Sequence, residues 1–209
     1  MTDELRLLQI LNARFLHDLS SSVGVVSNCL SLIDTHNKDI SNKAKLLAIE
    51  ESGNLTKKVK VFRGVYASPD GDAEMSVVYL TKLFQDFYSN NNKVELDIKF
   101  ETGVLYLESL LAKASLCLVM IISEASVRGG KLSFFCGNDK SNNFTKITFN
   151  SEDLKLNDET WDILTGKKDK EINIKNCREF YIRNLCEKSG YKISANKKRN
   201  SLECKFFKA

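Results

Sequence analysis

Two long stretches near the N-terminus carry apolar residues at helical spacing, and they constrain the fold more than any other feature of the sequence. In the first, over about residues 3–33, Leu8, Phe15, Leu19 and Val26 fall on one face of a helix. This stripe is widened on both sides by Leu5, Leu11, Val23, Cys29 and Leu30. The polar segment 34–39 that follows is suited to a turn.

The second stretch can begin at Ser41, a good N-cap residue, and continue to about Tyr66. Its apolar residues recur at three- and four-residue intervals: Ala44, Leu47, Ala48, Leu55, Val59, Phe62 and Tyr66. This spacing predicts an antiparallel partner for the first helix. Because a lone hairpin cannot cover both of its apolar sides, we expect a homodimer whose two hairpins form a four-helix bundle.

The segment 67–72 contains the only proline of the chain, Pro69, together with glycine and aspartate, a combination that breaks a helix. We therefore predict a helical-hairpin domain over residues 1–67 and a second domain over 73–209.

The second domain mixes both periodicities. Helical patterns cover residues 75–88, 107–127, 157–164 and 174–188, and strand patterns cover 94–100, 131–136, 144–149, 191–195 and 201–207. Gly129-Gly130 ends the second of these helices, and Gly190 lies at a suitable C-cap position after the last. This order predicts an α+β fold whose second domain is an α/β sandwich, with helices on one face of a mainly antiparallel sheet.

Composition excludes several classes of protein. With 209 residues and 43% apolar content the chain can build sizeable cores, and no apolar run is long enough to span a bilayer. No basic region followed by an apolar run marks a signal peptide, so we expect a cytoplasmic protein without a membrane partner. Six cysteines without a CxxC pair indicate reduced thiols, neither a disulfide framework nor a metal site: Cys29, Cys117, Cys136, Cys177, Cys186 and Cys204.

The formal net charge of +4 is modest. The basic clusters at 57–58, 167–170 and 197–199 are interrupted by acids or lie in predicted turns, and no aromatic residues interleave them. They are therefore interpreted as solvated surface, and no nucleic-acid partner is expected.

His17 lies on the face of the first helix opposite the apolar stripe. Its neighbours at offsets of three, four and seven are mostly small or polar: Ile10, Ala13, Arg14, Ser20, Ser21 and Gly24, with Asn28 eleven residues on along the same face. The imidazole is therefore expected to be accessible. An ordinary exposed histidine has the same pattern, and His36, in the polar turn, is interpreted in that way.

A hairpin that carries His17-Asp18, a short linker and an α/β sandwich, in this order, resemble the two-domain core of sensor histidine kinases. The resemblance covers nearly the whole chain and is closer to the ChpT-type histidine phosphotransferases of alphaproteobacteria. It rests on Arg14, His17-Asp18-Leu19, Ser21, Val23-Gly24, Asn28, Phe62-Arg63, Glu124-Ala125 and Arg128-Gly129-Gly130. Ser22 departs from both families, which usually carry proline there, so the first helix would lack its usual kink.

The resemblance raises the question of ATP binding, which in such kinases needs two helix asparagines, a DxGxG turn and a glycine-rich lid. Here the asparagine places are Met120 and Glu124, the turn 150–154 has no glycine, and no GxG occurs in the chain. Glu124 could bind a metal, but a phosphate cradle is lacking. We therefore expect a degenerate ATPase-like domain, and neither a cofactor nor a metal in this chain.

The resemblance implies a phosphorelay in which His17 takes a phosphoryl group from the receiver domain of a hybrid kinase and passes it to a response-regulator receiver of the cell-cycle type. A neutral imidazole is nucleophilic at cytosolic pH, and the receiver would supply Mg²⁺. Asp18 would orient or polarise the ring, or be a plain solvated carboxylate. Arg14 would neutralise phosphate or contact the partner. Clearance for the partner, or merely close helix packing, is expected from Ser20, Ser21 and Gly24, and Asn28 is a further expected partner contact.

Two alternatives remain open from the sequence. An ATP-dependent sensor histidine kinase would need a nucleotide site in the second domain. A non-catalytic dimeric adaptor would bind receivers with His17 incidental. A metal-dependent HD hydrolase is set aside because its site needs more histidines than His36 can add.

Overall fold

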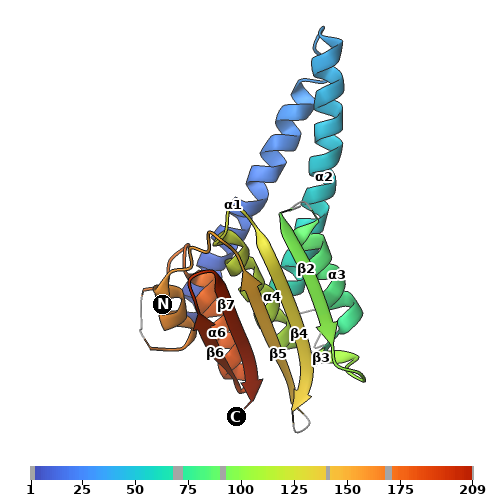
Figure 1. The fold of residues 1–209 in the computed structure, drawn as a ribbon. Helices are drawn as coiled ribbons and strands as arrows, with labels where there is room; N and C mark the ends of the chain where they lie inside the picture. Colours follow the sequence, from blue (N-terminus) through green and yellow to red (C-terminus); the bar gives the residue numbers. More distant parts are fainter. Residues whose placement is uncertain (1–2, 68–72, 90–92, 140–141, 168–170, 209) are drawn as a thin grey trace.

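The structure is a computed structural model that describes residues 3–67, 73–89, 93–139, 142–167 and 171–208. It begins with two antiparallel helices of equal length, α1 (Asp3–Ser31) and α2 (Lys38–Tyr66). Figure 1 shows this hairpin extending as a long arm beyond the rest of the molecule. The predicted hairpin is confirmed, and α1 runs without a break through Ser22.

The start of α2 corrects the predicted N-cap. Asn37 caps the helix, because its side-chain oxygen accepts from the backbone N–H groups of Asp39 at 3.0 Å and Ile40 at 3.2 Å. Ser41 lies inside the first turn, where its hydroxyl donates to the Ile33 carbonyl at 2.5 Å. The helix therefore starts one turn earlier than the sequence pattern indicated.

The second part of the chain is a five-stranded sheet in the order β2-β4-β5-β7-β6. Its strands are β2 (Val94–Phe100), β4 (Gly130–Asp139), β5 (Asn142–Asn150), β7 (Ser201–Lys208) and β6 (Tyr191–Lys197). Only the β2–β4 pair in this sheet is parallel, so the prediction of a mainly antiparallel sheet is confirmed.

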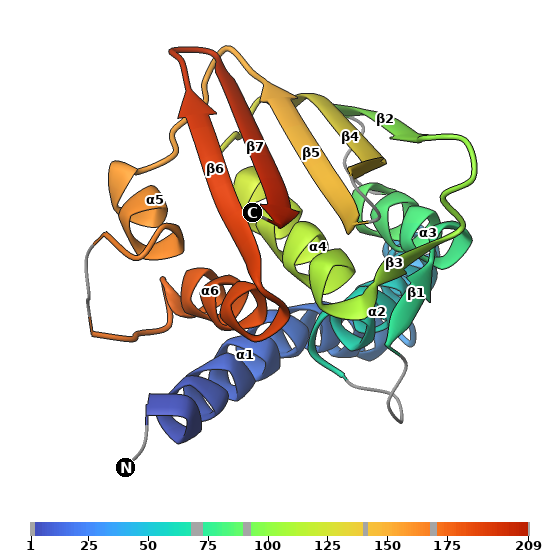
Figure 2. The same cartoon turned by 90° about the horizontal axis from the view of Figure 1, so that it is seen from below.

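One face of this sheet is covered by α3 (Val77–Tyr88), α4 (Ser109–Glu124) and α6 (Cys177–Ser189), with the short α5 (Asp158–Leu164) beside them. Figure 2 shows three layers: the sheet, these helices, and the base of the hairpin beyond them. We call the sheet with α3 to α6 the sandwich.

A two-stranded antiparallel ribbon was not predicted from the sequence. β1 (Glu74–Ser76) pairs antiparallel with β3 (Tyr106–Glu108), and each strand leads directly into a helix. The helices predicted over 75–88 and 107–127 therefore begin two residues later than expected, and the second ends at Glu124. The predicted start of α6 is also corrected, from 174 to Cys177, whereas Gly190 caps this helix in the left-handed conformation (φ 72°), as predicted.

The core joins hairpin and sandwich. α4 is buried along almost its whole length, and the last turns of α2 pack into the same cluster through Val61, Phe62 and Val65. Phe15 of α1 meets Phe62 edge-on at a centroid separation of 5.3 Å. The base of the hairpin is therefore fixed to the sandwich. Most of the predicted linker, residues 68–72, lies outside the described residues.

The outer part of the hairpin is less covered. The buried residues of α1 are Leu7, Leu11, Ser22 and Cys29. In the outer part of α1, Val23 and Leu30 of the predicted apolar stripe are about half exposed in the single chain, as are Leu5 and Leu8 at the base of the hairpin. None of the described helices is both long and apolar enough to cross a membrane.

Candidate functional site

His17 lies midway along α1, where its side chain is 75% exposed. Its Nδ1 is 3.4 Å from Oδ1 of Asp18, too long for a strong hydrogen bond but close enough to orient the ring. Because successive helix residues project about 100° apart, the Asp18 carboxylate approaches the imidazole from the side. Asp18 itself is only 20% exposed, so it is not a freely solvated carboxylate.

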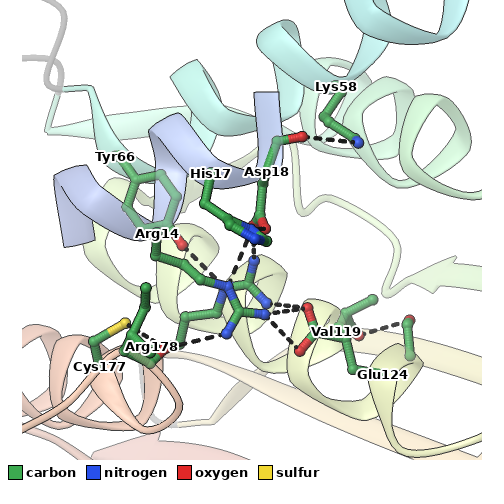
Figure 3. A network of polar contacts seen from close by, with 11 residues as sticks. Arg14, His17, Asp18, Lys58, Tyr66, Val119, Glu124, Cys177 and Arg178 are labelled. Carbon is green, nitrogen blue, oxygen red and sulfur yellow. Dashed lines mark hydrogen bonds and ion pairs between the residues drawn. The ribbon is translucent and has the colours of Figure 1, made fainter. Parts of the chain in front are cut away.

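Arg178, in the first turn of α6, holds the other oxygen of Asp18. Its NH2 group donates to Oδ2 of Asp18 at 3.0 Å, and its NH1 group pairs with Oε1 of Glu124 on α4. Its Nε donates to the Tyr66 hydroxyl at 3.3 Å. The guanidinium is only 6% exposed and uses all three nitrogens, so it connects both helices of the hairpin to the sandwich (Figure 3).

Arg14 completes a network of two arginines and two carboxylates. Its Nε lies 3.4 Å from Oδ2 of Asp18, and its NH2 group donates to both Glu124 oxygens at 3.0 Å. Its NH1 group donates to the Ile174 carbonyl at 3.1 Å. Arg14 is thus engaged with acids on its own helix and on the sandwich, which makes it a structural bridge beside His17 (Figure 3).

Burial and charge act in opposite directions on this network. Burial lowers the pKa of Arg178, but Tyr66 and Glu124 beside it outweigh that effect, so the net pKa is raised and the guanidinium stays charged. Burial also raises the pKa of Tyr66, which therefore remains a neutral phenol. Asp18 accordingly faces a permanent cation on its side away from His17.

Lys58 of α2 makes a second cross-link close to His17. Its ammonium donates to the Ser22 hydroxyl at 3.1 Å and to the Asp18 carbonyl at 3.3 Å. Ser22 is buried, at 8% exposure. The serine at this position thus keeps α1 continuous and gives α2 a hydrogen-bonding partner, two roles that proline cannot fill.

A groove of about 530 Å³ runs from His17 along the junction of hairpin and sandwich. Residues from both parts line it, among them His17, Asp18, Ser21, Lys58, Asp86, Met120, Glu124 and Arg178. Of the other predicted contact residues, Ser20 and Asn28 are exposed on α1 outside the groove. Gly24 is half-buried, and a methyl group there would meet nothing within 4 Å. The site is therefore open to a large partner.

Glu124 and the turn 150–154, which the sequence aligned with the nucleotide site of a kinase, make contacts within the chain. Glu124 is paired with both arginines of the network. In the turn 150–154, Asp153 accepts from the hydroxyls of Ser126 and Ser151 and from the backbone N–H groups of Val127 and Arg128. Among the described residues, no group of three or more His, Cys, Asp or Glu side chains is placed to hold a metal ion.

Sequence reasoning missed Arg178, Lys58 and Tyr66 as parts of this site. The sequence around each of them shows only an ordinary helical pattern, and it is the tertiary fold that brings the three side chains to α1. The predicted residues His17, Asp18 and Ser21 line one groove, and Arg14 contacts Asp18 beside it.

Comparisons with known proteins agree with this architecture. A family model described as "Histidine phosphotransferase C-terminal domain" matches residues 79–201. Among solved structures, a bacterial phosphotransferase is similar over 99% of this chain and 98% of its own, with 19% identity and a TM-score of 0.85. The nucleotide-free catalytic domain of histidine kinase ThkA covers 64% of this chain and 92% of its own, with 14% identity and a TM-score of 0.50.

Both structural matches show a shared fold, that of a histidine-kinase ATPase-like domain in the case of ThkA. No curated protein matches the chain significantly in sequence. The family match extends over more than half of the chain, from α3 to the start of β7. The chain therefore belongs to the histidine phosphotransferase family that this C-terminal domain defines.

Proposed function

We propose that the chain is a phosphorelay histidine phosphotransferase of the ChpT type. His17 takes a phosphoryl group from the receiver domain of a hybrid sensor kinase and passes it to the receiver of a response regulator, and ATP takes no part. The observation that carries this proposal is an exposed imidazole on a rigid helix, beside a carboxylate that the sandwich holds from the other side.

We propose distinct roles for the two ring nitrogens. Nδ1 faces Asp18, so its N–H can donate to that carboxylate, which leaves the Nε2 lone pair as the nucleophile. A bond forms from Nε2 to phosphorus while the bond from phosphorus to the receiver's aspartate oxygen breaks, and the aspartate leaves as a carboxylate. Asp18, fixed by Arg178, would stabilise the positive charge that develops on the ring.

The partner supplies the remaining charge compensation. Asp18 and Glu124 are both paired with arginines, which makes them poor ligands for a metal here. We therefore expect Mg²⁺ to bind to the receiver domain, where the aspartyl phosphate lies. Arg14 acts by holding the two acids in place.

The docking surface would combine α1 with the groove. Small and polar residues next to His17 leave room for a helix of the receiver: Ser20, Ser21, Gly24 and Asn28. The half-exposed apolar residues of α1 lie on a different side of the helix from His17 and support a homodimer through the hairpins. A transcriptional regulator of the cell-cycle type is the expected recipient.

Phosphoryl transfer tests this function directly. The phosphorylated receiver domain of a hybrid kinase is mixed, without ATP, with the wild type, His17→Ala and the matched control His36→Ala. We expect acid-labile, alkali-stable label on the wild type and on His36→Ala, and none on His17→Ala.

Two outcomes contradict the proposal. If no form is labelled while receiver binding is intact, His17 is incidental and the protein is an adaptor. If ATP alone labels the wild type at His17, the protein is a kinase.

A further inference from the structure

A second pocket, of about 720 Å³, lies at the base of the hairpin and shares no lining residue with the groove at His17. It is enclosed by the last turn of α2, the β1–β3 ribbon and the first turns of α3 and α4. Figure 2 shows these elements meeting below the sheet. Its polar lining includes Arg63, Ser76, Tyr79, Tyr106, Ser109 and Lys113. Its volume is in the range of sites for small molecules.

Lys113 is the unusual member of this lining. The residue is only 6% exposed, and it makes no hydrogen bond or ion pair with any described residue. Nζ of Lys113 reaches solvent in the pocket, while burial of the rest of the side chain lowers its pKa. The charged ammonium is thus partly desolvated, and an anion in the pocket would offset this cost.

Two further features make this pocket favourable for an anion. Arg63 lines it as a second cation and has no partner among the described residues. α4 begins here without a side-chain cap, because Glu108 accepts from Lys208 at 2.8 Å and accepts no hydrogen bond from the N–H groups of the first turn. The N–H groups and dipole of this helix end attract negative charge. Glu74 is the acid of the lining, so the cations outnumber it.

The rim of the pocket is aromatic. Tyr79 is 46% exposed at the start of α3, and Tyr106 is 55% exposed on β3. Rings at the mouth of a site present flat apolar faces on which another ring can stack. The pocket therefore combines a cationic interior with an aromatic entrance.

We propose that this pocket binds a small molecule that carries a phosphate group and a planar ring, with the phosphate between Lys113 and Arg63 and the ring against Tyr79 or Tyr106. Two cations and a helix N-terminus match a phosphate dianion better than a single carboxylate. The site lies apart from the groove at His17, so its occupancy does not enter the phosphoryl-transfer step.

Calorimetric titration of the full chain tests the site, with phenyl phosphate as the probe and inorganic phosphate and phenol as its two halves. We expect phenyl phosphate to bind more tightly than inorganic phosphate, and phenol not to bind. Loss of a charge-assisted hydrogen bond in Lys113→Gln or Arg63→Gln should weaken binding about tenfold or more. Lys45→Gln, which removes an exposed lysine of α2, is the matched control and should bind as the wild type does.

The proposal is overturned if phenyl phosphate does not bind to the wild type at millimolar concentration, or if folded Lys113→Gln and Arg63→Gln both bind it unchanged. Thermal unfolding checks that each variant is folded. If Lys113→Gln does not fold, the test rests on Arg63→Gln, because Arg63 is exposed. Replacing both rings, in Tyr79→Leu with Tyr106→Leu, separates the two halves of the ligand, because it should weaken phenyl phosphate but not inorganic phosphate. Phosphoryl transfer to His17 should persist in Lys113→Gln. A failure of ligand binding at this pocket is therefore distinguishable from a failure of the proposed relay.

Discussion

Arg178 reaches from the sandwich to two acidic side chains beside His17. Its bonds to Asp18 and Glu124 are made by a guanidinium that is 6% exposed, so solvent screens them little. A carboxylate held in this way keeps one oxygen towards the imidazole and cannot rotate freely. Arg178 is therefore a positioning residue, which acts on the phosphoacceptor through Asp18.

Replacing Arg178 by methionine keeps the volume and removes the charge. We expect transfer to His17 to slow about tenfold or more, because Asp18 loses its fixed orientation, and stability to fall by about 1–3 kcal/mol. Single-turnover transfer at increasing receiver concentration separates the two possible effects, since a lost positioning role lowers the maximal rate and leaves half-saturation unchanged.

The matched control for Arg178 lies on the same helix. Lys188 pairs with Glu4 at 3.5 Å on the surface of α6, and Lys188→Met should change stability by no more than about 0.5 kcal/mol. Equal rates for Arg178→Met and the wild type would show that Asp18 needs no support from the sandwich.

Asp153 sets a pH dependence in the turn that follows β5. Its hydrogen bond from Ser126, together with those from Ser151, Arg128 and Val127, outweighs burial and lowers the pKa of the carboxyl from 3.8 to about 2. A lowered folded-state pKa stabilises the native state at pH values above the unfolded pKa, and this contribution disappears as the pH falls through the folded pKa. Asp153→Asn should therefore be less stable than the wild type at pH 7.

This difference should shrink between about pH 4 and pH 2, where the wild-type carboxyl takes up its proton. Urea unfolding of both proteins at several pH values measures it, and other carboxyl groups cancel in the comparison. A difference that stays constant down to pH 2 would refute the assignment of the lowered pKa to Asp153.

At the scale of elements, the periodic sequence patterns predicted the long helices and strands, and the short elements and tertiary contacts without a periodic pattern were missed. The long periodic patterns of α1 and α2 and the alternation in β2, β4 and β5 gave the correct element types. The ribbon β1–β3 was missed because three-residue strands carry no measurable alternation, and the N-cap of α2 was misplaced because Asn37 and Ser41 are both good caps. Arg178 could not be found because its role depends on a tertiary contact 160 residues away along the chain.

The packing of α2 against α3 gives a prediction with an internal control. At Gly64 a methyl group would lie 2.4 Å from Cδ1 of Leu83, which is 1% exposed and can shift only against the surrounding core. At Gly53, on the outer part of the same helix, it would meet nothing within 4 Å. Alanine favours a helix over glycine by about 1 kcal/mol, whereas overpacking a core costs about 1–3 kcal/mol.

Gly53→Ala should therefore be more stable than the wild type and Gly64→Ala less stable. Chemical denaturation of the two variants measures both signs. If Gly64→Ala were also stabilised, α2 and α3 would be packed less closely than the structure has them.

At the scale of the whole molecule, the hairpin is covered at its base and open along its outer length. The sandwich buries Val61, Phe62 and Val65 of α2, whereas Val23 and Leu30 of α1 are 51% and 54% exposed in the single chain. Apolar residues in a continuous stripe are more typical of an interface than of a solvated helix. His17 lies on another side of α1, so an interface on this stripe would leave the phosphoacceptor accessible.

We therefore expect the protein to be a dimer in solution, and the double variant Val23→Glu with Leu30→Glu to be a folded monomer, because charged residues at the centre of an apolar interface are strongly unfavourable. Light scattering after size-exclusion chromatography measures the mass of each form. Val127→Glu is the matched control, since Val127 is 76% exposed at the end of α4 and away from the hairpin, and it should leave the dimer intact. A monomeric wild type would contradict the prediction, and a double variant that stays dimeric would show that the interface lies elsewhere.

Because each protomer carries its own groove, with residues of one hairpin and one sandwich, the monomeric variant should still accept a phosphoryl group at His17.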